Sequence, residues 1–383
     1  MSGVVMELRE AVVVEAVRTP IGKRGGSLSG VHAVDLSAIV LNELLARVGL
    51  DPSLVDDVYW GCVTQAGDQS SNVARFATLA AGWPESVPAV TINRACGSSQ
   101  QALEFAAHAV MSGREEMVVA GGVETMSRVP LGAARQMGEP YGRAVLDRFG
   151  VESLDQGTGA EIIAEEWGLS RPVLDAYAAE SHRRTAEAAD AGAFDAQLVA
   201  VGDLRADEGL RRETSVETLA KLKPAFRAGG RIHAGNASQI SDGAAALLVT
   251  TPERAVQQGW RPIVRFHSGA AVGADPVRML TAPIPATAQV LKRARLSIGD
   301  IGAFEVNEAF APVPLAWQIE TGADPARVNP LGGAIAVGHP LGASGAILTT
   351  RLINHMRDQG IQFGLQTMCE GGGTANATVY ELV

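Results

Sequence analysis

Two of the three cysteines and one histidine lie in glycine-rich segments that are far apart in the sequence. These residues are Cys96, Cys369 and His339, and their segments read Arg94-Ala-Cys-Gly-Ser-Ser99, Met368-Cys-Glu-Gly-Gly-Gly373 and Gly332-Gly-Ala-Ile-Ala-Val-Gly-His-Pro-Leu-Gly-Ala-Ser-Gly345. Glycine lets the backbone approach a reacting atom closely and lets successive N–H groups converge on one point. Two thiols and an imidazole in such turns indicate acyl transfer through a cysteine, with an oxyanion site beside it.

The elements around Cys96 favour a reactive thiol. A strand is predicted at 89–93, and apolar residues at helical spacing predict a helix over 98–112. Because a helix N-terminus favours negative charge, we expect the pKa of Cys96 to fall by about one to several units from about 8.5. Such a thiolate can attack a thioester carbonyl and form an acyl-enzyme. The alternative interpretation is a small buried core cysteine.

Three further residues are candidates for proton transfer or charge stabilisation. His339 can accept the proton of a nucleophile or stabilise an oxyanion, but its loop buries little, so a surface histidine is an equal alternative. Cys369 precedes three glycines whose N–H groups can form an oxyanion nest, and a core cysteine at a strand end is the alternative. Asn307, in Asn307-Glu-Ala-Phe310, can orient a water or a substrate, or it caps a helix.

Short apolar runs alternate with helical patterns on both sides of the middle region, which predicts a layered α/β fold. Strands are expected at 11–17, 58–63, 89–93, 117–121, 244–250, 301–306, 363–368 and 377–382, with an extended piece at 327–329. Helices are expected at 34–48, 98–112, 309–319 and 342–355, and another begins at Pro283. The order glycine turn, helix, strand ending in glycines occurs at 96–122 and again at 341–373, which indicates an internal duplication.

The middle of the chain has a different character. Residues 124–233 are charged and helical, with turn signals between the helices, and we interpret them as an insertion that covers the site. The predicted organisation is therefore a first half made of 1–123 and 234–252, the inserted domain 124–233, and a second half 253–383.

Composition excludes several classes of partner. The 383 residues carry a net charge of −10 and a pI of about 5.3, which argues against a nucleic-acid-binding or anionic-membrane-binding surface. Three cysteines without framework spacing fit free thiols in a reducing compartment. The segment Met1–Arg9 shows no signal-peptide pattern, and no apolar run is long enough to span a membrane. We expect a cytoplasmic enzyme that binds no metal.

Seven segments, taken in order, resemble the thiolase family, and the resemblance runs from about Val13 to Glu381. Four of them are the segments of Cys96, Asn307, His339 and Cys369 quoted above. The others are Val17-Arg-Thr-Pro-Ile-Gly22, Lys221-Leu-Lys-Pro-Ala-Phe226 and Ala234-Gly-Asn-Ala-Ser-Gln-Ile-Ser-Asp-Gly-Ala-Ala245. The resemblance implies a duplicated, five-layered α-β-α-β-α fold with an inserted covering domain.

The resemblance also implies a role for each candidate. Cys96 would carry the acyl group, and His339 would activate it. Cys369 would be the acid/base that protonates the leaving enolate. Asn307 would hold a water that, with His339, stabilises the enolate oxygen. The backbone N–H groups of Cys96 and Gly371 would form the second oxyanion hole, and a 3-oxoacyl-CoA would be cleaved by a ping-pong reaction.

Substrate contacts follow from the same resemblance. Ser238 would contact the pantetheine arm of coenzyme A, and Met279 matches a methionine that lines the acyl pocket of short-chain members. Lys221 and Arg212, with Lys223 and Arg227, are candidates for the phosphates of coenzyme A, although a solvated charged surface is the alternative for each. Coenzyme A would be a co-substrate, with no permanently bound cofactor. Family members assemble through the first half, so a homo-oligomer, a dimer or tetramer, is expected.

Departures from the family pattern bear on the type of thiolase. Gln156-Gly-Thr-Gly-Ala-Glu161, preceded by Asp155, stands where short-chain members carry a methionine preceded by a histidine. Glu370 places a carboxylate beside Cys369 and, if buried, would raise the pKa of that thiol. Residues 22–32 and 61–70 resemble thiolases of bacterial fatty-acid and sterol side-chain degradation. A degradative 3-oxoacyl-CoA thiolase is therefore favoured over a biosynthetic acetoacetyl-CoA thiolase, with a decarboxylating ketosynthase or an inactive thiolase-like binding protein as more distant alternatives.

Overall fold

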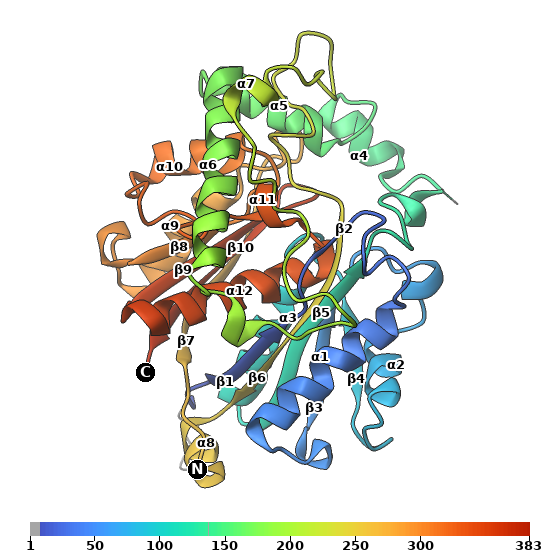
Figure 1. Cartoon of the computed structure of the whole chain (residues 1–383), viewed down its shortest axis with the longest axis vertical. Coiled ribbons are helices and arrows are strands. Elements are labelled where there is room, and N and C mark those ends of the chain that lie inside the picture. Colours follow the sequence, from blue (N-terminus) through green and yellow to red (C-terminus); the bar gives the residue numbers. More distant parts are fainter. Residues whose placement is uncertain (1–7, 137) are drawn as a thin grey trace.

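A single ten-stranded sheet runs through the computed structural model, which describes residues 8–136 and 138–383 (Figure 1). Its main strand order is β4-β3-β5-β6-β1-β7-β10-β9-β8, and the short β2 (Gly22–Lys23) pairs with β6. The segment Met1–Arg9, for which no signal peptide is predicted, lies mostly outside the described residues. None of the helices in the described ranges combines the length and apolar character needed to cross a membrane.

The first half of the sheet contains β1 (Val12–Arg18), β3 (Asp57–Gly61), β4 (Ala89–Ile92), β5 (Met117–Thr125) and β6 (Ser241–Thr250). Its helices are α1 (Ala33–Val48), α2 (Val73–Ala80) and α3 (Ser98–Met111). The strand β3 pairs in parallel with β4 and β5, whereas β6 pairs antiparallel with β5 and β1. The predicted strands and helices of this half are confirmed, with ends that differ by a few residues.

The second half repeats this arrangement. Its strands are β7 (Val264–Gly273), β8 (Ala303–Val306), β9 (Phe363–Glu370) and β10 (Thr374–Leu382), and its helices are α9 (Pro283–Ala294), α10 (Pro312–Thr321), α11 (Ala334–Val337) and α12 (Leu341–Gln359). Here β8 pairs in parallel with β9, and β10 pairs antiparallel with β9 and β7. The extended piece around Val328 forms a parallel bridge with Phe304, at the place that β4 occupies beside β3. This correspondence confirms the predicted duplication.

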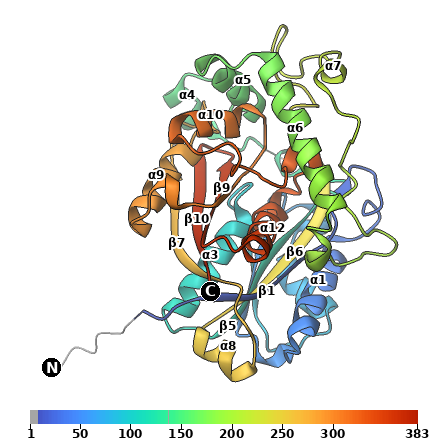
Figure 2. The same cartoon turned by 60° about the vertical axis from the view of Figure 1, so that its left-hand side comes forward.

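The two halves of the sheet meet only where β1 pairs with β7, through Val12 with Arg265 and Val13 with Val264. Helices α3 and α12 pack against each other between the halves (Figure 2). Helices α1 and α2 cover the outer face of the first half, and α9 and α10 cover that of the second. The predicted order α-β-α-β-α is therefore present.

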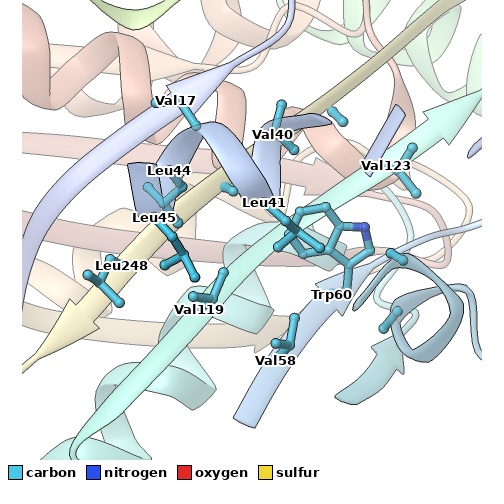
Figure 3. Packing of buried hydrophobic residues seen from close by; sticks show 14 of the residues in the cluster. Val17, Val40, Leu41, Leu44, Leu45, Val58, Trp60, Val119, Val123 and Leu248 are labelled. Atoms are coloured by element: carbon cyan, nitrogen blue, oxygen red, sulfur yellow. The ribbon is translucent and has the colours of Figure 1, made fainter. Parts of the chain in front are cut away.

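The apolar face of α1 shows how each outer layer is held. Leu41, Leu44 and Leu45 point from α1 toward Trp60 and Val119 of the sheet (Figure 3). Trp60 is fully buried, and its indole N–H donates to Ser37 Oγ at 3.2 Å. Each buried leucine adds about 1.5–3 kcal/mol to the stability of the fold relative to an exposed leucine. The contact between α1 and the sheet therefore holds this outer layer in place.

A long segment connects β5 to β6, whereas only Gly371, Gly372 and Gly373 separate β9 from β10. The segment contains α4 (Gly142–Phe149), α5 (Gln156–Glu166), α6 (Arg171–Asp190) and α7 (Val216–Leu219), and α8 (Pro252–Gln258) links the two halves after β6. Helices α4 to α7 lie at one end of the molecule, above the ends of the strands (Figure 1). The long connection therefore lies on the side of the molecule to which β5 and β9 run.

Candidate active site

The Cys96 loop joins β4 to α3 and holds its cysteine in a strained turn. Ala95 has a φ of 44°, a left-handed conformation that alanine rarely adopts. Asn93 Oδ1 accepts the Ala95 N–H at 2.9 Å, and Ser98 Oγ donates to the Ala95 carbonyl at 2.6 Å. Cys96 stands directly before α3, as predicted, and is 2% exposed. Its side chain packs on Leu348 of α12 and Met368 of β9, so the loop of one half rests on the other half.

The His339 loop joins α11 to α12 at the corresponding place in the second half. His339 Nδ1 lies 2.6 Å from Ser344 Oγ, and the hydroxyl of Ser344 donates its single proton to the Pro340 carbonyl at 2.8 Å. Nδ1 must therefore carry the ring proton and donate it to Ser344, because Ser344 has no second proton to give. This tautomer leaves Nε2 unprotonated, 3.4 Å from Asn307 Nδ2.

The expectation that the His339 loop buries little is wrong. The side chain is 3% exposed, because α11, α12 and the Gln239–Ser241 segment enclose it. Burial lowers the pKa of His339 to about 4, since a charged imidazolium would lose its hydration there. His339 is therefore neutral at physiological pH and able to accept a proton at Nε2.

Asn307 and Cys369 come from adjacent parallel strands, β8 and β9, whose carboxyl ends meet at one edge of the sheet. The Asn307 N–H donates to the Thr367 carbonyl at 3.1 Å, which fixes the register of the two loops. The Asn307 side chain makes a hydrogen bond with Cys369, and its Oδ1 is buried without a partner. Burial and the neighbouring Cys96 raise the pKa of the Cys369 thiol, so the two sulfur atoms share one site.

The predicted fall in the pKa of Cys96 is wrong. Burial, followed by the Glu370 carboxylate, raises the pKa of the Cys96 thiol to about 12. Hydrogen bonds from the Gln156 side chain and from the backbone N–H groups of Cys96 and Gly371 act in the opposite direction. The helix terminus does not outweigh desolvation. The Cys96 thiol is therefore neutral at physiological pH.

Several polar residues that support the loops have no recognisable signal in the sequence. Glu308 Oε1 accepts from the Tyr177 hydroxyl at 2.9 Å, and Oε2 accepts from the Ser181 hydroxyl at 2.7 Å, which ties the Asn307 loop to α6. Glu124 Oε2, at the end of β5, accepts the N–H groups of Val63 and Gly342 at 2.9 and 2.8 Å. Each is an ordinary glutamate in the sequence, and only the fold brings its donors together.

The sequence identified Gln156 only as a departure from the family pattern. It is the first residue of α5, and Asp155 caps that helix by accepting the Thr158 N–H at 2.8 Å. A Cβ atom on Gly371 would lie 3.3 Å from Gln156 Nε2, so the amide stands between Gly371 and Cys96. The glutamine adds a hydrogen-bond donor to the site where a methionine would supply none.

Of the predicted substrate-binding residues, two lie beside the catalytic loops. The Ser238 N–H donates to the Ala309 carbonyl at 2.9 Å, which places the serine against the Asn307 loop. Met279 is 3% exposed and belongs to the same apolar cluster as Cys369, with a φ of 58°.

The predicted phosphate ligands lie apart from the four catalytic side chains. Arg212 is exposed, and both its terminal nitrogens bind the Asp190 carboxylate at 2.9 and 2.7 Å. Lys221 is exposed just after α7. The third cysteine, Cys62, is fully buried in the core cluster that includes the apolar face of α1. Within residues 8–136 and 138–383, no cluster of three or more His, Cys, Asp or Glu side chains could hold a metal ion.

The arrangement joins two buried thiols, Cys96 and Cys369, with the neutral imidazole of His339. Backbone N–H groups of Cys96 and Gly371 lie beside the Cys96 thiol, and the Asn307 amide lies beside His339 and Cys369. Such a site can form an acyl-thioester, stabilise an oxyanion and move a proton to or from carbon.

Two family models match nearly the whole chain. The thiolase N-terminal domain matches residues 11–253, and the thiolase C-terminal domain matches residues 260–382. The division between the two models falls at α8, which links the two halves of the sheet.

Known proteins agree with these models over almost the full length. A steroid 3-ketoacyl-CoA thiolase, FadA6 of Mycobacterium tuberculosis, is 50% identical over 98% of this chain and 94% of its own length. A 3-ketoacyl-CoA thiolase of Erwinia tasmaniensis is 46% identical over 98% of this chain and 100% of its own length. The crystal structure of the Bacillus anthracis acetyl-CoA acetyltransferase has a TM-score of 0.91 and 36% identity, and covers 98% of this chain and 100% of its own. Fold, active-site loops and relatives agree, and the chain belongs to the thiolase family of acyltransferases.

Proposed function

We propose that this enzyme cleaves a 3-oxoacyl-CoA with coenzyme A, giving acetyl-CoA and a shortened acyl-CoA, and that Cys96 carries the acyl group. The observation that carries the proposal is the meeting of two chemically different thiols around one neutral imidazole. Cys96 is surrounded by N–H donors suited to an acyl oxyanion, whereas Cys369 contacts the Asn307 amide.

Acylation begins when His339 Nε2 takes the proton of the Cys96 thiol. The sulfur attacks C3 of the substrate, and the N–H groups of Cys96 and Gly371 stabilise the oxyanion, with the Gln156 amide beside them. The raised pKa of Cys96 supports this order of events, because the thiol is neutral at rest and loses its proton only as the new bond forms.

Collapse of the oxyanion breaks the bond between C2 and C3, and the electron pair stays on C2 as the enolate of acetyl-CoA. The enolate oxygen accepts a hydrogen bond from the protonated His339, and a water bound at the buried Oδ1 of Asn307 assists. Cys369 gives its proton to C2, and acetyl-CoA leaves. The unpartnered Oδ1 supports a water site, because a buried acceptor requires a donor.

The second half-reaction restores the enzyme. The Cys369 thiolate takes the proton of the incoming coenzyme A thiol, and the coenzyme A sulfur attacks the acyl carbon on Cys96. Cys96 leaves and recovers its proton from His339. Each catalytic group thus ends in its starting protonation state, and no permanent cofactor is needed.

A degradative role is favoured over biosynthetic condensation of two acetyl-CoA molecules. The relatives of higher identity are named 3-ketoacyl-CoA thiolases, including a steroid enzyme, whereas the acetyl-CoA acetyltransferase shares 36% identity. A decarboxylating ketosynthase has no second reactive cysteine, so Cys369 argues against that alternative.

Substrate binding is assigned to the inserted domain 124–233 and the adjoining Ser238 loop. Ser238 would contact the pantetheine arm, and Met279 would line the acyl pocket beside Cys369. For the phosphates of coenzyme A, Lys221 is a better candidate than Arg212, because Asp190 already neutralises the Arg212 guanidinium.

We also propose that the protein is a homo-oligomer that assembles through the first half. The edge strand β4 ends the strand order and exposes Val90, and α2 and α3 expose further apolar side chains, namely Phe76, Leu79 and Phe105. The three free thiols, two of them needed for catalysis, support a reducing compartment such as the cytoplasm.

The division of labour between the cysteines is tested with single variants. Cys96→Ala should release no acetyl-CoA from a 3-oxoacyl-CoA. Cys369→Ala should still be acylated at Cys96 by an acyl-CoA donor, detected as a mass increase on the Cys96 peptide, but should not complete turnover. Cys62→Ala is the matched control, since this buried cysteine lies in the core beneath α1, and it should keep parental turnover. Release of acetyl-CoA by Cys96→Ala at the parental rate, or full turnover by Cys369→Ala, would refute the mechanism.

A further inference from the structure

Glu370 follows Cys369 on β9, so its side chain points to the opposite face of the strand, away from the Cys369 thiol. There it lies fully buried beneath the Cys96 loop. A Cβ atom on Gly97 would lie 1.9 Å from Glu370 Oε1, which means that the carboxyl group fills the space beside this glycine. The group touches the loop of the nucleophile without facing the substrate.

The two oxygens of the carboxyl group have different surroundings. Oε2 accepts the hydroxyl of Thr374 at 2.7 Å. Oε1 has no partner, although a buried carboxylate oxygen without a donor is costly. Asn376 Oδ1 is also buried without a partner, and it lies 3.2 Å from the same Gly97 Cβ position. Two buried acceptors without hydrogen-bond partners therefore lie beside the same glycine.

Rotating the Asn376 amide cannot resolve this conflict. Its Nδ2 already donates to Gln101 Oε1 at 3.1 Å and to Glu104 Oε2 at 3.0 Å. A flipped amide would place an oxygen against these two acceptors and lose both bonds. A single proton on Glu370 Oε1 satisfies both unpartnered oxygens, because the acid O–H can donate to Asn376 Oδ1.

The charges around this carboxyl group come from several elements. Cys369 lies on the same strand, Cys96 and Arg94 on the loop before α3, and Glu104 on α3 itself. Burial raises the pKa of Glu370 to about 8, and Glu104 adds to the increase. Thr374, the half-buried Arg94 and the backbone N–H of Asn376 oppose it. The direction agrees with the hydrogen-bond argument.

We propose that Glu370 is a positioning residue that works as the neutral acid, donating its proton to Asn376 Oδ1, and that this uncharged state allows Cys96 to become negative during the reaction. An ionised Glu370 would repel the developing thiolate in a site closed to water, where charges interact strongly. This inference rests on the proposed function only in taking Cys96 as the nucleophile.

The test measures the reactivity of the Cys96 thiol and not enzyme turnover. A failure of this inference can therefore be told apart from a failure of the proposed reaction. Wild type and Glu370→Gln are alkylated with iodoacetamide between about pH 6.5 and pH 9.5, and the Cys96 peptide is followed by mass spectrometry. The glutamine amide donates to Asn376 Oδ1 as the acid does, but it cannot ionise. We expect equal rates at about pH 6.5, and a Glu370→Gln rate about 10-fold higher at about pH 9.5, which corresponds to about one pKa unit of Cys96.

Two measurements guard against a merely structural effect. Glu115 is another poorly exposed glutamate; it lies just before β5 and accepts a hydrogen bond from the Tyr59 hydroxyl of β3. The control variant Glu115→Gln should leave the pH dependence of Cys96 alkylation unchanged. In wild type alone, the logarithm of the rate should rise with a slope below one above about pH 8, as Glu370 ionises. This second measurement needs no variant to fold.

The remaining outcomes overturn the proposal. A Glu370→Gln rate that already exceeds wild type at about pH 6.5 would mean that Glu370 is ionised in the working enzyme. Equal alkylation rates of Glu370→Gln and wild type at every pH would mean that the charge of Glu370 does not affect the pKa of Cys96. Slower alkylation of Glu370→Gln throughout, or a wild-type profile with one simple ionisation, would also contradict it.

Discussion

The imidazole of His339 is prepared for one task by its two polar neighbours. Ser344 Oγ accepts the hydrogen bond from Nδ1–H, and Asn307 lies beside Nε2. Burial then keeps the ring neutral, so Nε2 carries a lone pair at rest. A base of low pKa in a closed site can take a proton from Cys96 only in concert with bond formation, which restricts deprotonation to the moment when substrate is present.

This state of His339 predicts an unusual pH dependence. Because the neutral imidazole is the active form, kcat/KM for a 3-oxoacyl-CoA should fall as pH drops through the pKa of about 4, and not through the ordinary value near 6.5. Steady-state rates should therefore stay level from about pH 7 to about pH 5. An acid limb centred near pH 6.5, with the fold intact by circular dichroism, would contradict the assignment.

Ser344→Ala should weaken the base without removing it. The alanine leaves Nδ1–H without its acceptor, so the ring loses its fixed tautomer and orientation, and kcat should fall by about 10-fold or more. Thr350→Ala is the matched control on the same helix, since its hydroxyl bonds only to the Ala346 carbonyl, and it should leave kcat near the parental value. Equal effects of the two substitutions would point to a general loss of helix stability.

At the residue scale, the sequence predicted which residues belong to the site better than it predicted their surroundings. The types and order of Cys96, His339 and Cys369 were sufficient to suggest thiol chemistry, and the family resemblance assigned roles that stay predictions. The sequence could not predict that His339 is buried or that the pKa of Cys96 rises. Both depend on residues such as Ser241 and Glu370, which approach from other elements only in the folded chain.

At the scale of elements, each proposed catalytic residue lies where a strand or helix begins or ends. Cys96 precedes α3, His339 precedes α12, and Cys369 and Asn307 stand at the carboxyl ends of β9 and β8. The strands and helices were largely predictable because their apolar periodicity is clear. An exception is β7, whose sequence Val-Arg-Phe-His-Ser-Gly-Ala-Ala-Val-Gly mixes polar residues and glycine into the pattern. Its place in the sheet is set by pairing with β10 and β1.

Gly97→Ala tests how tightly the Cys96 loop is seated. The new methyl group would meet the Glu370 carboxyl at 1.9 Å, so the loop or the strand must shift. Overpacking of this kind costs about 1–3 kcal/mol, measured as a lower midpoint of urea unfolding, and should slow acylation of Cys96. Gly30→Ala, where a methyl group meets nothing within 4 Å, is the control. A parental unfolding midpoint and acylation rate for Gly97→Ala would contradict this close contact.

At the scale of the whole molecule, the inserted segment holds the two halves together from outside. Its Phe194 ring lies between two buried guanidinium groups, Arg18 of β1 at 5.4 Å and Arg351 of α12 at 4.8 Å from the ring centre. Asp207 of the same segment binds Arg18 at 2.7 Å. The covering domain is therefore anchored to both repeats. No local sequence pattern could reveal this, because the partners are distant and of ordinary type.

The open edge of the sheet predicts the surface of self-association. Val90→Lys places a charge on the exposed face of β4, beside Phe76 and Phe105, and should convert the oligomer to a smaller species in analytical ultracentrifugation. Val256→Lys on α8 introduces the same charge at an equally apolar exposed site away from β4, and should leave the mass unchanged. An unchanged mass for Val90→Lys would place the interface elsewhere.

The duplication of the sheet allows the two repeats to supply different residues to one site. The Cys96 loop and the His339 loop occupy equivalent places in the two repeats, and their helices α3 and α12 pack side by side. Two identical copies of one repeat, facing each other in this way, would offer the same residue twice. Joining the repeats in one chain removes that constraint, since each loop can then change alone. In the proposed mechanism, one repeat supplies the nucleophile, and the other supplies both partners in proton exchange.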